Sequence, residues 1–195
     1  MNTGGYIERL DDIMATRNIL KDGDRGLSKK SRVVTDFNQR LHTLLDDMRE
    51  TLIEANGLGL AAPQVGVLRR AALVVDTSIE TESMEEQIIE LINPEIISLE
   101  GEQSGSEGCL SMPGVYGIVT RPEIVKIKAQ DRHGNPFELE GKELAARAVC
   151  HEIDHLDGVV FTSIAERLLT EEELAELTAK NERSENEEEE ENQQE

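Results

Sequence analysis

The segment HEIDHLDGVVF, residues 151–161, carries residue types and a spacing that suit a metal site. Four residues turn an α-helix by about 400°, so His151 and His155 share one face and both imidazoles can reach one ion. Glu152 directly follows the first histidine. A metal ion that activates water needs a third protein ligand and an open coordination position. The segment therefore raises the question of where the third ligand lies.

The third ligand is not supplied by the same segment. One large subfamily of metalloproteases places a third histidine six residues after the second, in the pattern H-E-x-x-H-x-x-G-x-x-H. This chain follows that pattern through Gly158 and has Phe161 where the last histidine would stand. A phenyl ring cannot bind a metal ion. The third ligand must come from elsewhere in the chain, and its identity decides the function.

The element that must position the two histidines is a helix expected over residues 142–156, KELAARAVCHEIDHL. Leu144, Ala148, His151 and His155 fall on one stripe of this helix. Its small residues suit close packing against a sheet. We expect the stripe to point inward, where an unpaired imidazole would be costly and a metal ion would satisfy it.

A second helix is predicted within residues 35–57, TDFNQRLHTLLDDMRETLIEANG, where apolar residues recur at helical spacing. Thr35 or Asp36 is the expected N-cap, and Asn56 and Gly57 are expected to end the helix.

The middle of the chain predicts β-strands. A short buried strand is expected at residues 71–76, and a second at 88–97 after an acidic loop. Residues 123–131 alternate apolar and polar side chains, which is typical of a half-buried strand. A turn at 133–135 then leads into residues 137–141, which predicts a hairpin.

The charge of the chain is strongly acidic and uneven. The net charge is −21, which makes nucleic acid a poor partner for the surface as a whole and argues against direct nucleic-acid specificity. Residues 171–195 contain twelve glutamates against Lys180 and Arg183, a net of −10. The run SENEEEEENQQE has no apolar residue to bury. We expect an acidic C-terminal tail over 171–195 that is partly helical and then disordered.

Length and composition indicate one domain with a real core. No run of 18 or more apolar residues occurs, so no membrane span is expected, and the first residues carry charges where a signal peptide would be apolar. Residues 1–13 read as a flexible extension ahead of the domain. Only Cys109 and Cys150 are available for disulfide bonding, and in a reducing compartment each is a buried thiol or a ligand. We expect a soluble, cytoplasmic monomer.

Two further segments are unusual in composition. Cys109 lies in SGSEGCLSMPG, whose glycines and Pro-Gly turn predict a tight, irregular backbone. Cys109 is either a ligand or a buried core thiol. Cys150 is rotated about 100° from His151 on the expected helix and is interpreted as a core residue. GLGLAAPQVG, residues 57–66, lacks the Gly-Lys-Ser/Thr ending of a phosphate loop and reads as a small-residue turn.

Together, GLGLAAPQ, EGCLS and HEIDH, in this order, resemble the three motifs of the peptide deformylase family. The resemblance covers roughly residues 14–170 and includes LINPEI and MPGVYGIVTRPEIVKIKA. It implies an α+β fold in which small antiparallel sheets pack around a central helix that bears HEIDH. It also implies a metallo-hydrolase that removes the formyl group from the N-terminal methionine of nascent proteins and releases formate.

The resemblance implies a role for each motif. Cys109 would join His151 and His155 as the third ligand of one divalent ion, ferrous iron natively, with zinc, nickel or cobalt as substitutes. Glu152 would take a proton from water and pass it to the leaving amine. The donors for the developing oxyanion would be the Gln64 side-chain amide and the Leu110 backbone N–H.

The substrate implied is an N-formylmethionyl nascent peptide. It would lie as an extra strand along small residues, with contacts at Leu58, Gly59 and Gly108. Glu107 and Arg121 are expected to pair behind the ligands and to hold the Gln64 loop. Transient ribosome contact follows from the substrate, although the acidic surface does not explain it.

Two alternatives remain open from the residues alone. A zinc endopeptidase could use the same HEIDH, but it would need a carboxylate or histidine as third ligand, and Phe161 counts against it. A non-catalytic metal-binding module would favour a closed site of four ligands and would not need Glu152.

Overall fold

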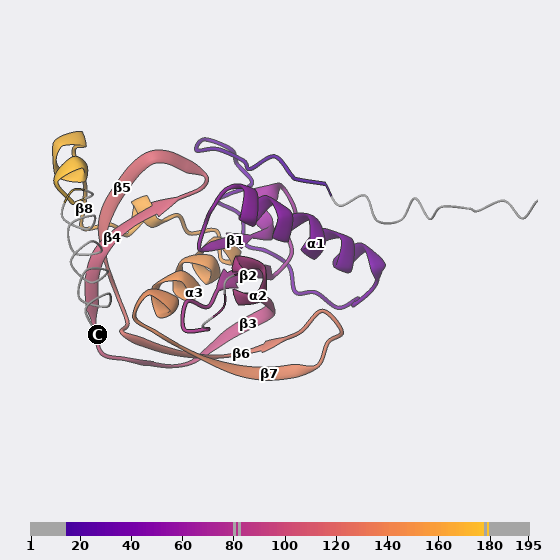
Figure 1. Cartoon of the computed structure of the whole chain (residues 1–195). Coiled ribbons are helices and arrows are strands. Elements are labelled where there is room, and N and C mark those ends of the chain that lie inside the picture. The colour runs from indigo at the N-terminus through magenta and orange to yellow at the C-terminus, as the bar shows by residue number, and fades with distance from the viewer. Residues whose placement is uncertain (1–14, 80, 82, 178, 180–195) are drawn as a thin grey trace, which may run out of the picture.

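A computed structural model describes residues 15–79, 81, 83–177 and 179, and within them the chain forms two antiparallel sheets and two main helices (Figure 1). The larger sheet has five strands in the order β1 (Gly59–Ala61), β2 (Ala71–Val75), β3 (Ile88–Glu100), β6 (Ile124–Gln130) and β7 (Pro136–Lys142). The smaller sheet has the order β4 (Gln103–Cys109), β5 (Met112–Arg121) and β8 (Arg167–Leu168). The expected α+β class is confirmed.

The two main helices are α1 (Gln39–Glu54) and α3 (Glu143–Leu156), which lie on opposite faces of the larger sheet. The shorter helical elements are η2 (Ala62–Val65), α2 (Met84–Gln87) and η3 (Phe161–Ser163). All five residues of β2 are buried, because Leu73 packs in the cluster that contains α1 while its neighbour Val74 packs with α3. The continuous apolar run of this strand therefore reflects a sheet covered on both faces.

Helix α1 begins later than the sequence predicts. Asn38 is its N-cap, and the Asn38 side chain accepts hydrogen bonds from the backbone N–H groups of Arg40 and Leu41. The prediction of Thr35 or Asp36 as the cap is therefore wrong. Several good capping residues stand close together here, and the one that reaches the first free N–H groups of the helix takes the role.

Helix α3 lies between the larger sheet and the smaller sheet and carries both histidines (Figure 1). The predicted inward stripe is only partly correct. His151 and His155 are 9% and 1% exposed, but Leu144 is 46% exposed and lines a cavity. The stripe therefore lines the cavity at its Leu144 end and is buried at its His155 end. Cys150 is buried against the larger sheet, as expected for a core residue.

The smaller sheet was not predicted from periodicity. The segment that contains Cys109 was expected to be tight and irregular, yet it forms the seven-residue strand β4. An irregularity is confined to its end, where the register shifts between Gly108, paired with Tyr116, and Cys109, paired with Met112. The register shift bends the end of β4, and the Cys109 side chain points toward α3.

The hairpin formed by β6 and β7 is confirmed, with Gln130 paired to Pro136. Residues 171–177 are helical. The expected extension over residues 1–13 and the end of the expected acidic tail lie outside the described residues. None of the helices in the described part of the chain combines the length and apolar character needed to cross a bilayer.

Candidate metal centre

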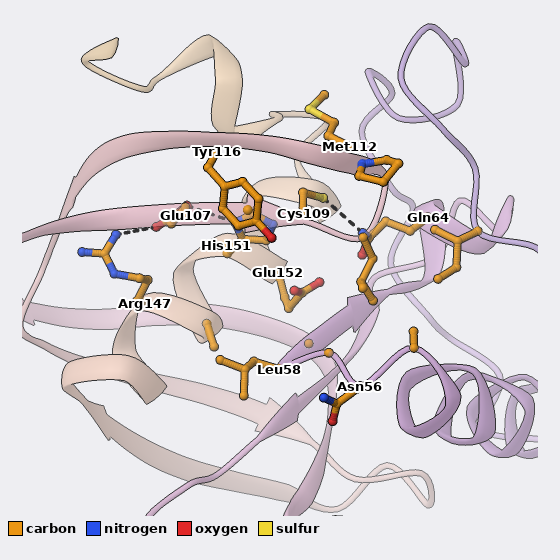
Figure 2. A pocket seen from close by; sticks show the side chains of 18 of the residues that line it. Asn56, Leu58, Gln64, Glu107, Cys109, Met112, Tyr116, Arg147, His151 and Glu152 are labelled. Atoms are coloured by element: carbon orange, nitrogen blue, oxygen red, sulfur yellow. Dashed lines mark hydrogen bonds and ion pairs between the residues drawn. The ribbon is translucent and has the colours of Figure 1, made fainter. Parts of the chain in front are cut away.

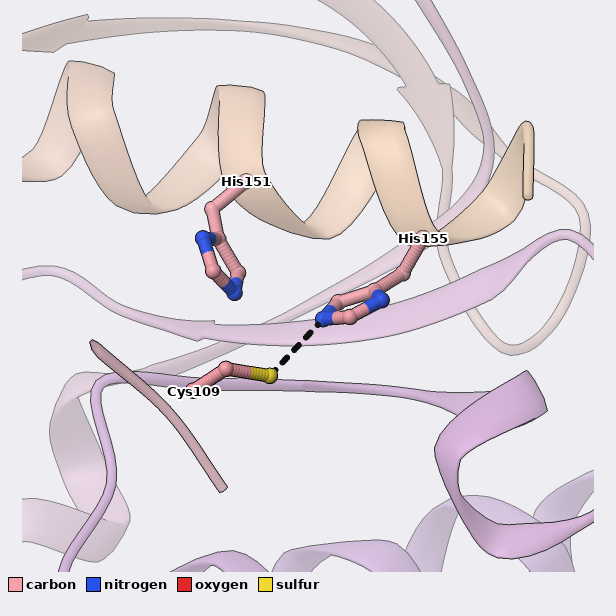
Figure 3. A group of neighbouring side chains, drawn as sticks. All are labelled: Cys109, His151 and His155. Carbon is pink, nitrogen blue, oxygen red and sulfur yellow. Dashed lines mark hydrogen bonds between the residues drawn. The ribbon is translucent and has the colours of Figure 1, made fainter. Parts of the chain in front are cut away.

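The structure brings together the three expected ligands from two elements (Figure 3). His151 and His155 project from successive turns of α3, and Cys109 reaches them from the end of β4. One ligand atom from each residue lies within 4.8 Å of the others. The Cys109 Sγ is 3.2 Å from the Nε2 of His155. Two imidazoles and a thiol at this separation form a three-donor set with room for one ion.

The electrostatics of the two histidines fit a cation at this point. Burial lowers the pKa of His155 to about 3, so its ring is neutral, as a ligand must be. Burial also lowers the pKa of His151, but hydrogen bonds with Cys109 and Glu107 outweigh it and raise that pKa to about 10. The negative charge of Glu107, which favours a second proton on the His151 ring, would likewise favour a metal cation on the ring's other nitrogen, because either one adds positive charge to the imidazole.

Glu152 is a buried carboxyl group next to the three donors. It is 3% exposed, and its Oε2 has no hydrogen-bond partner among the described residues. Burial raises the pKa of Glu152 to about 7, against a lowering by the positive charge of His151. A carboxyl group whose pKa lies near neutrality can both accept and return a proton.

Gly59 leaves the space that Glu152 occupies. A Cβ atom built on Gly59 would lie 2.4 Å from the Oε1 of Glu152. No side chain can stand there without moving the carboxyl group. The glycine of GLGLAAPQ is therefore required by the close approach of β1 to α3.

Gln64 lies on η2 and is 1% exposed. Its Oε1 accepts a hydrogen bond of 2.8 Å from the Ala61 N–H, which fixes the orientation of the amide. Its Nε2 consequently faces the ligands and lies 3.5 Å from the Cys109 Sγ and 3.3 Å from the Ser111 Oγ. The short helix thus presents an amide donor to the metal centre.

A cavity of about 620 Å³ opens onto this centre (Figure 2). Leu58, Gly59, Gly108 and Leu110 all line it, together with Cys109, His151 and Glu152. The ring of Tyr116 covers Gly108, where an added Cβ would lie 2.7 Å from the ring. The residues expected to contact a substrate therefore share one cavity with the residues expected to do the chemistry.

Glu107 and Arg121 pair as expected, and the pair also contacts His151. The Arg121 Nε donates to the Glu107 Oε1 at 2.8 Å, and the Glu107 Oε2 lies 3.0 Å from the Nδ1 of His151. Burial raises the pKa of Glu107, but hydrogen bonds from His151 and Arg121 outweigh it and lower the pKa to about 2. The pair therefore contacts the ring of His151, a candidate ligand, and its expected hold on the Gln64 loop stays a prediction.

Arg147 also contacts Glu107, with its Nη1 2.8 Å from the Oε1. Its contact with Glu107 was not predicted from the sequence. The available signal was its position four residues before His151, which places both on one face of the helix.

Comparisons of sequence identify the relatives of the chain. The family model described as polypeptide deformylase matches residues 16–170. A peptide deformylase of Lachnoclostridium phytofermentans is 59% identical over 148 residues, which is 76% of this chain and 88% of that protein. Peptide deformylase 1 of Bacillus subtilis is 48% identical over 164 residues, 84% of this chain and 99% of that protein.

Solved structures give the same result. The crystal structure of a peptide deformylase from Legionella pneumophila superposes with a TM-score of 0.71 at 39% identity, covering 87% of this chain and 99% of the other. A class I type b peptide deformylase from Acinetobacter baumannii with Met-Ala-Ser bound has a TM-score of 0.71 at 31% identity, covering 78% of this chain and 99% of the other.

Proposed function

This chain belongs to the polypeptide deformylase family, and from that premise we propose how its residues divide the work of deformylation. The chain is a metal-dependent hydrolase that removes the formyl group from the N-terminal methionine of newly synthesised proteins and releases formate. The assignments that follow rest on the geometry of the metal centre and its cavity.

Cys109, His151 and His155 hold one divalent ion. The support is their mutual distance, the neutral ring of His155 and the lack of a fourth protein donor within this group in the described residues. A thiolate donates more charge than a carboxylate, which suits ferrous iron as the native ion and zinc, nickel or cobalt as substitutes. When bound, such an ion acts as a Lewis acid that makes a water molecule a stronger acid.

Glu152 moves the proton. Its carboxyl group accepts a proton from the attacking water and returns it to the leaving amine, which becomes the free amino terminus. Its unpartnered Oε2 and a pKa near 7 support this role, because the group can be unprotonated before attack and protonated after it.

Gln64 and Leu110 stabilise the oxyanion that develops on the formyl oxygen. The Gln64 Nε2 is directed to the ligand side by the bond between its Oε1 and Ala61. Leu110 follows Cys109 and lines the cavity. An amide held in place before the reaction costs no reorganisation during it.

The substrate lies beside β1 as an additional strand. β1 is the end strand of the larger sheet, so one of its edges faces away from β2. Leu58, Gly59 and Gly108 contact the peptide, and the apolar part of the cavity receives the methionine side chain. The Acinetobacter baumannii relative, whose structure holds Met-Ala-Ser, supports a short peptide with N-terminal methionine as ligand.

The substrate indicates where in the cell the chain acts. Nascent chains with a formylated terminus are met at the ribosome, so we place the chain in the cytoplasm as a monomer with transient ribosome contact. The net charge of −21 opposes tight binding to ribosomal RNA.

The observation that carries the proposal is the convergence of the Cys109 thiol, two histidines and an unpartnered carboxyl group in one cluster, of which Cys109, His151 and Glu152 line the cavity. The test is formate release from formyl-Met-Ala-Ser by anaerobically purified protein, with the unformylated peptide and a longer protein chain as controls. Formate release without chain cleavage is expected. Cleavage of the longer chain would indicate an endopeptidase, and no formate after loading with nickel or cobalt would refute the proposed site.

A further inference from the structure

Arg147 links the helix that carries the metal ligands to both long strands of the smaller sheet. It lies one turn before His151 on α3 and is 7% exposed. Its Nη1 donates to the Val119 carbonyl of β5 at 3.0 Å, and its Nη2 donates to the Gln103 carbonyl of β4 at 3.3 Å. The planar fork of the guanidinium therefore has its position fixed by backbone groups of two strands.

The same guanidinium completes the hydrogen bonding of Glu107. The Glu107 Oε1 accepts from the Arg121 Nε and from the Arg147 Nη1, each at 2.8 Å. The Oε2 accepts from the Arg121 Nη2 at 3.1 Å. It also lies 3.0 Å from the His151 Nδ1, a contact visible in Figure 2. Two arginines thus fix the carboxylate, and its remaining acceptor site is directed at His151.

The backbone leaves room for this arrangement at Gly105. A Cβ atom on Gly105 would lie 3.1 Å from the Arg147 Nη2. Arg121 cannot replace Arg147, because its Nη1 already donates to the Asp154 Oδ2 at 2.6 Å. Without Arg147 the Glu107 Oε1 would keep only the Arg121 Nε as a partner, and Arg121 and His151 alone would orient the carboxylate.

We propose that Arg147 is a positioning residue for deformylation: it orients the Glu107 carboxylate, which orients the His151 ring and directs its Nε2 to the metal ion. The inference rests on the proposed function, in which His151 is a ligand. Groups that hold a ligand histidine typically change metal affinity or activity by 10- to 100-fold when removed.

The alternative is that Arg147 only fastens α3 to the smaller sheet. A matched control separates the two, because Arg132 is another partly buried arginine in an ion-pair network. Arg132 lies in the turn between β6 and β7 and pairs with Glu90 and with Asp46. It does not line the cavity of the metal centre. Arg132→Met should reduce stability and leave the metal centre unchanged.

The experiment uses the full chain loaded with cobalt, as Arg147→Met, Arg147→Lys and Arg132→Met. The readouts are the visible absorption of the cobalt centre, the rate of cobalt release to a chelator, and kcat and KM for formyl-Met-Ala-Ser.

For Arg147→Met we expect an altered spectrum, cobalt release about 10-fold faster and kcat about 10-fold lower. KM should change by less than about 2-fold, because Arg147 acts through His151 rather than on the peptide. Arg147→Lys keeps the charge but lacks the planar guanidinium, so its spectrum, cobalt release rate and kcat should lie between those of the wild type and Arg147→Met.

A cobalt spectrum and release rate in Arg147→Met that match those of Arg132→Met would overturn the inference. If Arg147→Met does not fold, a wild-type spectrum and release rate in Arg147→Lys would overturn it equally. The variant His151→Ala distinguishes failure of the inference about Arg147 from failure of the proposed function. Loss of cobalt in His151→Ala with normal Arg147 variants refutes the inference alone, whereas retention of cobalt and turnover in His151→Ala refutes the proposed function as well.

Discussion

Cys109 and Cys150 show at the scale of single residues how position decides what a thiol can do. Cys150 faces the core from α3, and burial raises its pKa to about 11. Cys109 stands at the end of β4, 3.2 Å from a histidine nitrogen and within the proposed ligand set. A thiol that is kept protonated by burial is an inert packing group, while one beside two imidazoles is available to a metal ion.

This contrast gives a paired prediction. Cys109→Ala should lose most of its metal, and kcat/KM should fall by at least about 100-fold, because two histidines alone leave the ion weakly held. Cys150→Ala should keep its metal and turnover and lose about 1–2 kcal/mol of unfolding free energy as a small core truncation. Metal content per chain and formate release check both. Equal metal content in the two variants would contradict the ligand assignment.

Gly59 is the second residue-scale case. In Gly59→Ala the added Cβ would overlap the Glu152 carboxyl group, which must move. We expect kcat to fall about 10- to 100-fold, since a displaced proton-transfer group loses its alignment. Gly23→Ala is the control: Gly23 has a φ of 89° and open space around it, so the change costs stability without a clash. Similar kcat values for the two variants would show that Glu152 does not depend on this space.

At the scale of elements, β6 and β4 show what periodicity can and cannot predict. In β6, Val125 and Ile127 are buried while Lys128 is exposed, so the alternation is visible in the sequence. In β4 the only fully buried position is Glu107. Because the buried residue of β4 is a paired carboxylate, the strand shows no alternation of apolar and polar residues. The prediction of irregular chain was wrong for that reason.

The residues of the metal centre were likewise only partly predictable from sequence periodicity. The spacing of His151 and His155 predicts a shared helix face, and the structure has it. The link to Cys109 came from the resemblance to a family, because no spacing rule connects the end of a strand to a histidine 46 residues later. Arg147 was missed because an arginine on a helix is usually solvated, and its burial depends on carbonyl groups and on Glu107, which only the fold brings near.

Glu107 ties β4 to both β5 and α3, which gives a pH prediction at this scale. Its pKa in the folded chain is about 2, below the ordinary value of 4.5. The group therefore contributes stability that is fully present above pH 4.5 and is lost as pH falls toward 2. Urea unfolding across this range should show a steeper loss in the wild type than in Glu107→Gln. Parallel curves would mean that the carboxylate is not held as described.

At the scale of the whole molecule, the charge is divided between the catalytic region and the C-terminal end. Residues 171–195 hold a net charge of −10 out of −21, and the family match ends at residue 170. The residues that line the cavity all fall between Ile19 and Glu152 in the sequence. The acidic end therefore lies outside the sequence that supplies the chemistry.

Deletion of residues 184–195 should leave kcat/KM for formyl-Met-Ala-Ser within about 2-fold of the full chain, because these residues lie outside the family match. Solubility at high protein concentration should fall, since the deletion removes negative charge. Steady-state kinetics on both chains checks this. A 10-fold loss of kcat/KM would place part of the acidic end in substrate binding.

The central claim is that a Cys109, His151 and His155 metal centre works with Glu152 as the proton carrier. The most direct measurement is metal content and formate release on the same preparation of Glu152→Gln, which keeps the shape of the side chain. We expect one metal ion per chain, as in the wild type, and formate release lowered by about 100- to 10,000-fold. Turnover within a few-fold of the wild type would contradict the proton role, and loss of the metal would show that Glu152 belongs to the ligand set.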